Sequence, residues 1–175
     1  MYAFSRYGSP LGGITLVSRG DALCGLYIDG QRFPFEGRGE ARETDAIVRA
    51  KAWLDRYFAG ERLDISELTL APEGSEFQRL VCRLLCGIPY GEVATYGELA
   101  KKIAEIQGIE RMSAQAVGGA VGRNPISIII PCHRVIGAGG NLTGYDGGLG
   151  KKIWLLRHEG VDMSGMYVPK KGNAL

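Results

Sequence analysis

The sequence predicts an α+β fold in two parts, a small N-terminal antiparallel-sheet-plus-helix domain followed by a mostly helical C-terminal domain. Short β-prone stretches separated by turn residues come first in the chain. One amphipathic helical pattern closes this part, and helical patterns dominate the remainder. We therefore divide the chain into domains at residues 1–70 and 71–175.

The N-terminal part is expected to form an antiparallel meander and one helix. Turns that contain glycine separate its strands, which we expect at residues 2–8, 13–18 and 22–29. A polar, glycine-rich stretch follows at residues 35–42. Thr44 or Asp45 can then cap a helix that runs to about Phe58. Apolar residues recur along this helix at helical spacing, so one of its faces can be buried.

The C-terminal part is expected to be helical. A linker at residues 64–75 precedes its first three helices, which we expect at residues 75–86, 95–106 and 113–121. A short turn containing Gly108 joins the last two. Two short helices joined by a tight turn are the outline of a helix-turn-helix, although helical hairpins that bind no DNA are common.

The helix expected at residues 113–121 carries almost no large side chains. Glycine within a helix costs about 1 kcal/mol relative to alanine, so helix stability does not explain this composition. A bare helix surface lets another backbone approach closely. That backbone can belong to DNA or to a neighbouring helix of the same protein, and the composition favours neither. The small residues are Ala114, Ala116, Gly118, Gly119 and Ala120.

Composition and charge are those of a soluble globular protein. No apolar run approaches the roughly 20 residues that a membrane span needs, and the N-terminus lacks a signal-peptide pattern. We expect a cytoplasmic monomer with no membrane partner. The net charge is +2, with 9 basic and 10 acidic residues in residues 1–70 and 12 and 9 in the rest. This asymmetry permits nucleic-acid binding by the second part without arguing for it.

The four cysteines, Cys24, Cys82, Cys86 and Cys132, are expected to be free thiols, because a chain of this size can rely on a core. Cys82 and Cys86 stand four residues apart on one expected helix. Core packing is favoured over a zinc pair, since no further cysteine or histidine lies at ligand spacing. We therefore predict no metal site.

Cys132 is the candidate nucleophile. The apolar, β-branched run at residues 127–130 is expected to be extended before Pro131 and to lead directly into Cys132 and His133. A thiol becomes nucleophilic when a neighbouring base or cation favours the thiolate, and histidine is the usual partner. Glu159, near the end of the final helix, can orient an imidazole as catalytic triads require. A buried structural cysteine is the alternative.

A glycine-rich loop at residues 137–150 follows the cysteine. Loops of this length inside compact domains are usually functional or disordered. A phosphate cradle would be one use of such a loop, but the spacing matches neither a Walker loop nor a dinucleotide fingerprint. We therefore predict no nucleotide and no other cofactor.

Seven short motifs together resemble the methylated-DNA–protein-cysteine methyltransferase family, the O6-alkylguanine-DNA alkyltransferases. The resemblance is dense over residues 75–160 and covers the N-terminal part only in outline. The motifs are Phe77-Gln78, residues 88–96, residues 116–120, Asn124-Pro125, residues 130–135, Gly144-Tyr145 and residues 158–160.

The resemblance implies a structural, RNase-H-like N-terminal domain and a C-terminal domain with a winged helix-turn-helix. The partner is double-stranded DNA containing O6-alkylguanine. The recognition helix enters the minor groove, and the damaged nucleotide is flipped out of the stack. An alkyl group then moves from O6 of guanine, and from O4 of alkylthymine, irreversibly to Cys132. Because the thioether product is stable, each molecule acts once.

Residue roles also follow from the resemblance. Glu159 orients His133, which deprotonates Cys132 through a bridging water. Tyr96 is implied to donate a hydrogen bond to N3 of the base, and Asn124 to tie the recognition helix to the cysteine loop. Further substrate contacts are implied for the Val135 carbonyl and for the backbone at Tyr145 and Asp146. DNA contacts are implied for Thr95, Tyr96, Ser113, Ala114, Gln115, Gly118 and Arg123. Val121 and Ser127, near the pocket by resemblance, are implied as gates for bulky adducts.

The sequence departs from the family pattern at two positions. Gln115 stands where the family has an intercalating arginine, so slower or weaker flipping is expected. Asp146 stands where vertebrate members have serine. The first 70 residues also lack the histidine-containing zinc pattern of some relatives and a second cysteine that could accept alkyl groups from phosphotriesters.

Two other classes of protein have to be considered. A cysteine hydrolase would use the same three side chains but would turn over, and it would leave the bare helix unexplained. A non-catalytic lesion sensor resembles the same family, but such proteins lack the cysteine. The presence of Cys132 therefore argues against a sensor.

Overall fold

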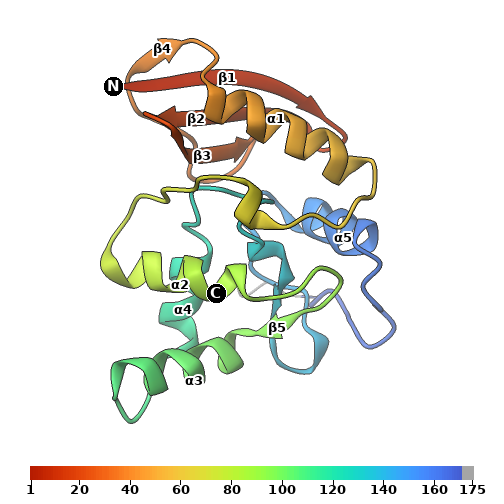
Figure 1. Ribbon diagram of the computed structural model, residues 1–175. Helices are drawn as coiled ribbons and strands as arrows, with labels where there is room; N and C mark the ends of the chain where they lie inside the picture. The colour runs from red at the N-terminus through yellow and green to blue at the C-terminus, as the bar shows by residue number, and fades with distance from the viewer. Residues whose placement is uncertain (171–175) are drawn as a thin grey trace. The chain divides into compact units, whose positions relative to one another are not determined.

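The computed structural model of the protein describes residues 1–170 (Figure 1). The chain divides into two compact units, and the first of them ends at Glu73. A later segment, Pro125–Ile129, belongs to this first unit. The predicted boundary after residue 70 lies close to Glu73. That Pro125–Ile129 belongs to the first unit was not predicted from the sequence. Residues 171–175 of the predicted second domain lie outside the described residues.

The first unit is built on a sheet of order β3-β2-β1-β4. The predicted antiparallel meander is confirmed, with β1 at Tyr2–Ser9, β2 at Gly12–Arg19 and β3 at Ala22–Ile28. The sheet gains a fourth strand that was not predicted, because β4 (Gly39–Ala41) pairs in parallel with β1. All three residues of β4 are exposed, so pairing occurs without the apolar alternation that marks a strand in sequence.

Helix α1 (Asp45–Phe58) covers one face of this sheet (Figure 1). Of the two predicted caps, Thr44 and Asp45, it is Thr44 that caps the helix, by accepting a hydrogen bond from the Ile47 N–H. Burial of a large apolar side chain contributes about 1.5–3 kcal/mol, and the helix buries several. The buried residues are Ala46, Ile47, Ala50, Trp53, Leu54 and Tyr57.

The segment that returns to the first unit is a turn and not the extended run that was predicted. Ile128 has a φ of 70°, and the Ile129 N–H donates to the Ser127 carbonyl oxygen at 2.8 Å. Only the residue directly before a proline is forced out of the helical region, so Pro131 restrains Ile130 and leaves the earlier residues unrestricted. The backbone N–H of Leu26, in β3, fixes the segment by donating a hydrogen bond to the Pro125 carbonyl oxygen at 2.8 Å.

The second unit contains the predicted helices, each within two residues of its expected bounds. Polar N-caps begin all three, and two of these caps form a capping box, in which a side chain three residues later bonds back. The helices are α2 (Glu76–Cys86, capped by Ser75), α3 (Tyr96–Gln107, capped by Thr95) and α4 (Ala114–Val121, capped by Ser113).

The rest of the second unit surrounds the cysteine. Strands β5 (Ala94–Thr95) and β6 (Val135–Ile136) form a short parallel pair. Helix α5 (Leu149–His158) begins inside the predicted glycine-rich loop, so that loop is two residues shorter than expected. Its first part is the short 3-10 helix Ala138–Gly140. Leu142 anchors the loop, because its side chain is buried in an apolar cluster with Ile136 and Leu156.

Candidate active site

Cys132 begins a short 3-10 helix, Cys132–Arg134, and its thiol is buried. The Ile130 carbonyl oxygen, just before Pro131, accepts hydrogen bonds from the Cys132 N–H and from Asn124 Nδ2, both at 2.8 Å. Asn124 follows α4 closely, and it is buried. The amide therefore links the end of α4 to the backbone that carries the cysteine.

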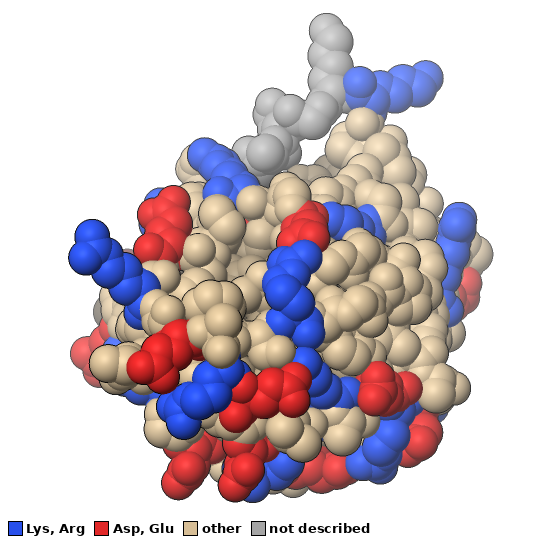
Figure 2. All heavy atoms as spheres, turned by 90° about the horizontal axis from the view of Figure 1, so that it is seen from above, with Lys and Arg blue, Asp and Glu red and all other residues tan. Residues whose placement is uncertain are grey.

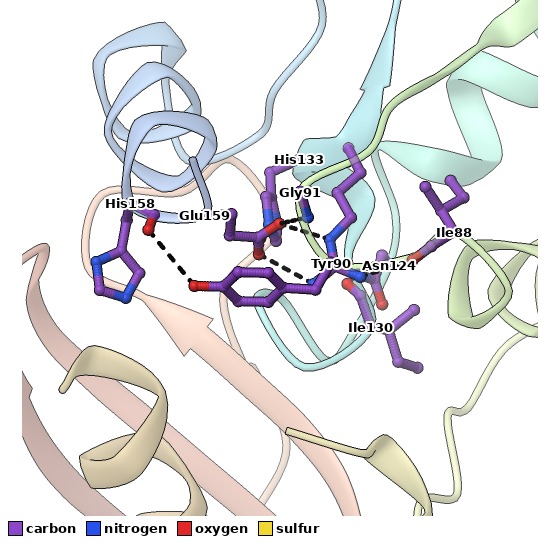
Figure 3. A network of polar contacts seen from close by, with 9 residues as sticks. Ile88, Tyr90, Gly91, Asn124, Ile130, His133, His158 and Glu159 are labelled. Carbon is purple, nitrogen blue, oxygen red and sulfur yellow. Dashed lines mark hydrogen bonds and ion pairs between the residues drawn. The ribbon is translucent and has the colours of Figure 1, made fainter. Parts of the chain in front are cut away.

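The side chains of His133 and Glu159 lie next to each other (Figure 3). His133 Nε2 is 2.7 Å from Glu159 Oε1, and both side chains are fully buried. Because an ionised carboxylate only accepts, this nitrogen carries a proton, and Nδ1 of the neutral ring keeps its lone pair. Nδ1 is buried and has no hydrogen-bond partner among the described residues. The imidazole is thus oriented by a carboxylate and free to accept a proton on its other side.

The pKa values of these groups follow from burial and from their partners. Burial alone would raise the pKa of Glu159, but hydrogen bonds and charge from His133 and Arg134 outweigh it and hold that pKa far below its usual range. Burial lowers the pKa of His133, so its neutral form is favoured. Burial also raises the pKa of the Cys132 thiol, although Asn124 and Lys152 oppose the rise. In this state of the site the thiol form of Cys132 and the neutral form of His133 are therefore favoured.

Two cations of the site had no role in the sequence-based prediction. Arg134, which follows His133, contacts Glu159 and the backbone of Ile88. Lys152, in the first turn of α5, is fully buried, and its Nζ donates to the carbonyl oxygens of Val135 and Thr143. Burial lowers the pKa of Lys152 to about 8. The one signal for Lys152 in the sequence is its helical spacing from the buried Leu155 and Leu156.

The Tyr96 hydroxyl forms its hydrogen bonds with the glycine-rich loop. Tyr96 is buried at the start of α3, and its Oη donates to the Gly144 carbonyl oxygen at 3.0 Å, with the Thr143 carbonyl oxygen at 3.4 Å. Gly144 has a φ of +72°, and a Cβ there would stand 2.7 Å from the same hydroxyl. A hydroxyl has one proton, so donation to a base would require release of the carbonyl.

The other predicted site residues fall into two groups. The Val135 carbonyl accepts from Lys152, the Tyr145 hydroxyl is buried without a hydrogen-bond partner among the described residues, and Asp146 is half-buried. Around α4, Ser113, Gln115 and Arg123 are exposed and Ala114 is half-buried, whereas Gly118 is buried. Thr95 caps α3. The proposed gates Val121 and Ser127 are both buried.

All four cysteines are free thiols, as predicted. Cys82 is buried as expected, but Cys86 is exposed, so the prediction of core packing was wrong for Cys86. Within residues 1–170, no group of three or more His, Cys, Asp and Glu residues is arranged so that it could hold a metal ion. In the same residues, no helix is long and apolar enough to cross a membrane.

A buried thiol, a neutral imidazole and an orienting carboxylate define a protein that acts through a cysteine nucleophile. A family model described as "6-O-methylguanine DNA methyltransferase, DNA binding domain" matches residues 76–161. A second model, "6-O-methylguanine DNA methyltransferase, ribonuclease-like domain", matches residues 3–72. The chain belongs to the 6-O-methylguanine DNA methyltransferase family, and the resemblance found in its sequence is confirmed.

Similar proteins match over most of their length. The methylated-DNA–protein-cysteine methyltransferase of Mycolicibacterium paratuberculosis is 43% identical over 159 residues, which are 91% of this chain and 93% of that protein. The protein of the same name from Methanosarcina acetivorans is 44% identical over 90% of this chain and 97% of its own. The crystal structure of Mycobacterium tuberculosis OGT in complex with DNA has a TM-score of 0.77 and 40% identity, with 94% of each chain covered.

Proposed function

We propose that this protein repairs DNA by moving a methyl or larger alkyl group from O6 of guanine irreversibly onto the sulfur of Cys132. The observation that carries the proposal is the buried arrangement of Cys132, His133 and Glu159 within the segment that the DNA-binding family model matches. The protein acts as a cytoplasmic monomer without a cofactor, and its substrate is double-stranded DNA that contains the lesion. O4-alkylthymine is a second substrate of the same chemistry.

The reaction is an in-line displacement at the alkyl carbon. His133 accepts the Cys132 proton at Nδ1 through a bridging water, while Glu159 stabilises the imidazolium that forms. The thiolate sulfur attacks the carbon, the carbon–O6 bond breaks, and its electron pair stays with the guanine. The guanine takes up one proton through water while the His133 imidazolium gives one up, so the proton lost by Cys132 is accounted for and the imidazole is neutral again. A thioether is not displaced under cellular conditions, so the protein is consumed by one transfer.

DNA binding is assigned to α3, the following turn and α4, as a winged helix-turn-helix in which α4 enters the minor groove. The exposed side of α4 offers Gln115, Ala116 and Gly119, and Ser113 and Arg123 flank it. Gly118 was expected among the DNA contacts, but it is buried within the unit. Gly119 replaces it in the proposed contact surface, because a Cβ at Gly119 would meet only open space. Release of Tyr96 Oη from Gly144 would then free that hydroxyl to donate to a flipped base.

Replacement of Gly119 by alanine separates helix stability from DNA contact. We expect the free energy of unfolding to rise by about 0.5–1 kcal/mol, because alanine is the better helix former and the space is open. We expect the dissociation constant for duplex DNA to rise several-fold, since the added methyl group keeps the helix from the groove. Urea denaturation and fluorescence anisotropy measure the two effects. Gly150→Ala on α5 is the matched control and should gain stability without loss of DNA affinity.

The proposed function is tested by intact-mass measurement after incubation with DNA that carries O6-methylguanine. One added methyl group per chain is expected in the wild type and in Cys86→Ala, which removes an exposed thiol. No addition is expected in Cys132→Ala. Product beyond one equivalent per chain would contradict a single transfer and favour a hydrolase. Methyl transfer that persists in Cys132→Ala would contradict the assignment of the acceptor.

A further inference from the structure

Arg134 makes a set of contacts that are more specific than packing requires. Its guanidinium is buried, and it donates from Nε to Glu159 Oε2 at 2.7 Å and from Nη2 to Glu159 Oε1 at 3.0 Å. The remaining Nη1 donates to the Ile88 carbonyl oxygen at 2.6 Å. The guanidinium carbon also lies 5.6 Å from the centre of the Tyr90 ring. Arg134 therefore forms a bidentate ion pair with the same carboxylate that orients His133.

The charges around His133 decide its protonation state. Within residues 1–170, Glu159 is the one carboxylate paired with the His133 ring. The Arg134 guanidinium, which does not lose its proton in proteins, already neutralises this carboxylate. Lys152 adds a second buried cation nearby. Asp146 is a half-buried acidic group that opposes Lys152 in its effect on the pKa of Cys132, and Tyr145 contributes a buried hydroxyl whose pKa is raised, so that it stays neutral. An imidazolium at His133 would therefore be an excess positive charge in a buried site.

We propose that Arg134 is a positioning residue for the transfer reaction: by neutralising Glu159 it keeps the His133 imidazole neutral, with Nδ1 free to accept the proton of Cys132. A lone buried carboxylate at hydrogen-bond distance would instead favour the imidazolium, which cannot accept a second proton. With Arg134 in place, Glu159 can fix the orientation of the ring without favouring its protonated form. The opposing effects of Glu159 and Arg134 on the pKa of His133 have the signs that this arrangement requires.

The proposal differs in its consequences from a purely structural role. If Arg134 only tied Glu159 to the Ile88 backbone, its loss would reduce stability and leave the protonation of His133 unchanged. Under the proposal, the loss of the Arg134 guanidinium leaves the negative charge of Glu159 to be balanced by His133. The imidazole then binds a proton more tightly, and the transfer reaction needs a higher pH.

NMR titration of the imidazole carbons tests this without DNA, because the chain has only two histidines. His158→Gln leaves His133 alone and provides the assignment. We expect wild-type His133 to stay neutral from about pH 6 to pH 8, the range in which an ordinary histidine titrates. In Arg134→Met we expect its pKa to rise by at least about one unit, equivalent to a tenfold change in proton affinity. Arg134→Lys, which keeps the charge, should show a smaller rise, and Arg157→Met, an exposed site on α5, no rise.

The rate of methyl transfer gives the second reading. The acid limb of the single-turnover rate against pH should move upward in Arg134→Met by the same shift as the His133 pKa. A wild-type His133 that is protonated at pH 7 overturns the proposal, even if the variant fails to fold. An unchanged His133 pKa in folded Arg134→Met overturns it as well. The proposal rests on His133 as the base, but if titrations behave as expected and Cys132 gains no methyl group, the proposed function alone has failed.

Discussion

Glu159→Gln is expected to slow methyl transfer by on the order of 10²–10⁴-fold at pH 7, with Cys132 left in place. The neutral amide does not stabilise an imidazolium, and it can offer its NH₂ group to His133 so that the ring adopts the wrong tautomer. Single-turnover kinetics with DNA containing O6-methylguanine measure the loss. A rate within a few-fold of wild type would show that Glu159 has no part in the chemistry.

The same substitution should cost stability because it breaks a buried ion pair. Removal of one partner leaves the Arg134 guanidinium buried without a counter-charge, at a cost of about 3–5 kcal/mol. Glu105→Gln removes an exposed carboxylate on α3 and should change the free energy of unfolding by less than about 0.5 kcal/mol. Urea denaturation of the two variants at pH 7 gives both values.

The stability contribution of Glu159 also has a definite pH dependence. Its pKa in the folded protein lies well below the value of about 4.3 in an unfolded chain. A depressed folded pKa contributes stability above the unfolded pKa and loses it as the pH falls toward the folded pKa. The difference in unfolding free energy between wild type and Glu159→Gln should therefore be constant near neutral pH and shrink below about pH 4.

The parts of the fold that the sequence predicts are those governed by neighbouring residues. The N-caps Thr44, Ser75, Thr95 and Ser113 are each recognisable because capping depends on residues within one turn. Strand β4 carries no such signal, because its pairing with β1 depends on backbone atoms far apart in the sequence. The turn at Ile128 is hidden for the same reason, since tertiary contacts hold a β-branched residue at positive φ.

In the active site, too, the features set by neighbouring residues are predictable from the sequence, and those set by tertiary contacts are not. Cys132 and His133 are adjacent, so their chemistry is visible in the sequence, and the family resemblance adds Glu159. The functions of Arg134 and Lys152 depend on burial beside particular carbonyl and carboxylate oxygens, which no local pattern reveals. Surface charge does not point to them either, because both side chains are buried. On the face that Figure 2 shows, basic and acidic side chains are interspersed.

Lys152→Met is expected to slow methyl transfer by at least about tenfold at pH 7, because Lys152 favours the charged form of Cys132 and methionine does not. The loss of the ammonium raises the pKa of the thiol, so the reaction of Cys132 with iodoacetamide should shift to higher pH. Peptide mass measurement follows that reaction. Lys101→Met, an exposed site on α3, removes the same charge and should leave the thiol pKa unchanged.

Stability against pH distinguishes this electrostatic role from simple packing. The pKa of Lys152 is about 8 in the folded protein and about 10.4 in an unfolded chain. The folded state therefore binds fewer protons between these values, and the contribution of Lys152 to stability increases as the pH rises through that window. The unfolding free energy of wild type should gain up to about 3 kcal/mol relative to Lys152→Met from pH 8 to pH 10.4. A difference that stays flat across this window would show that the pKa of Lys152 is not lowered in the folded protein, which would contradict an ammonium buried away from water.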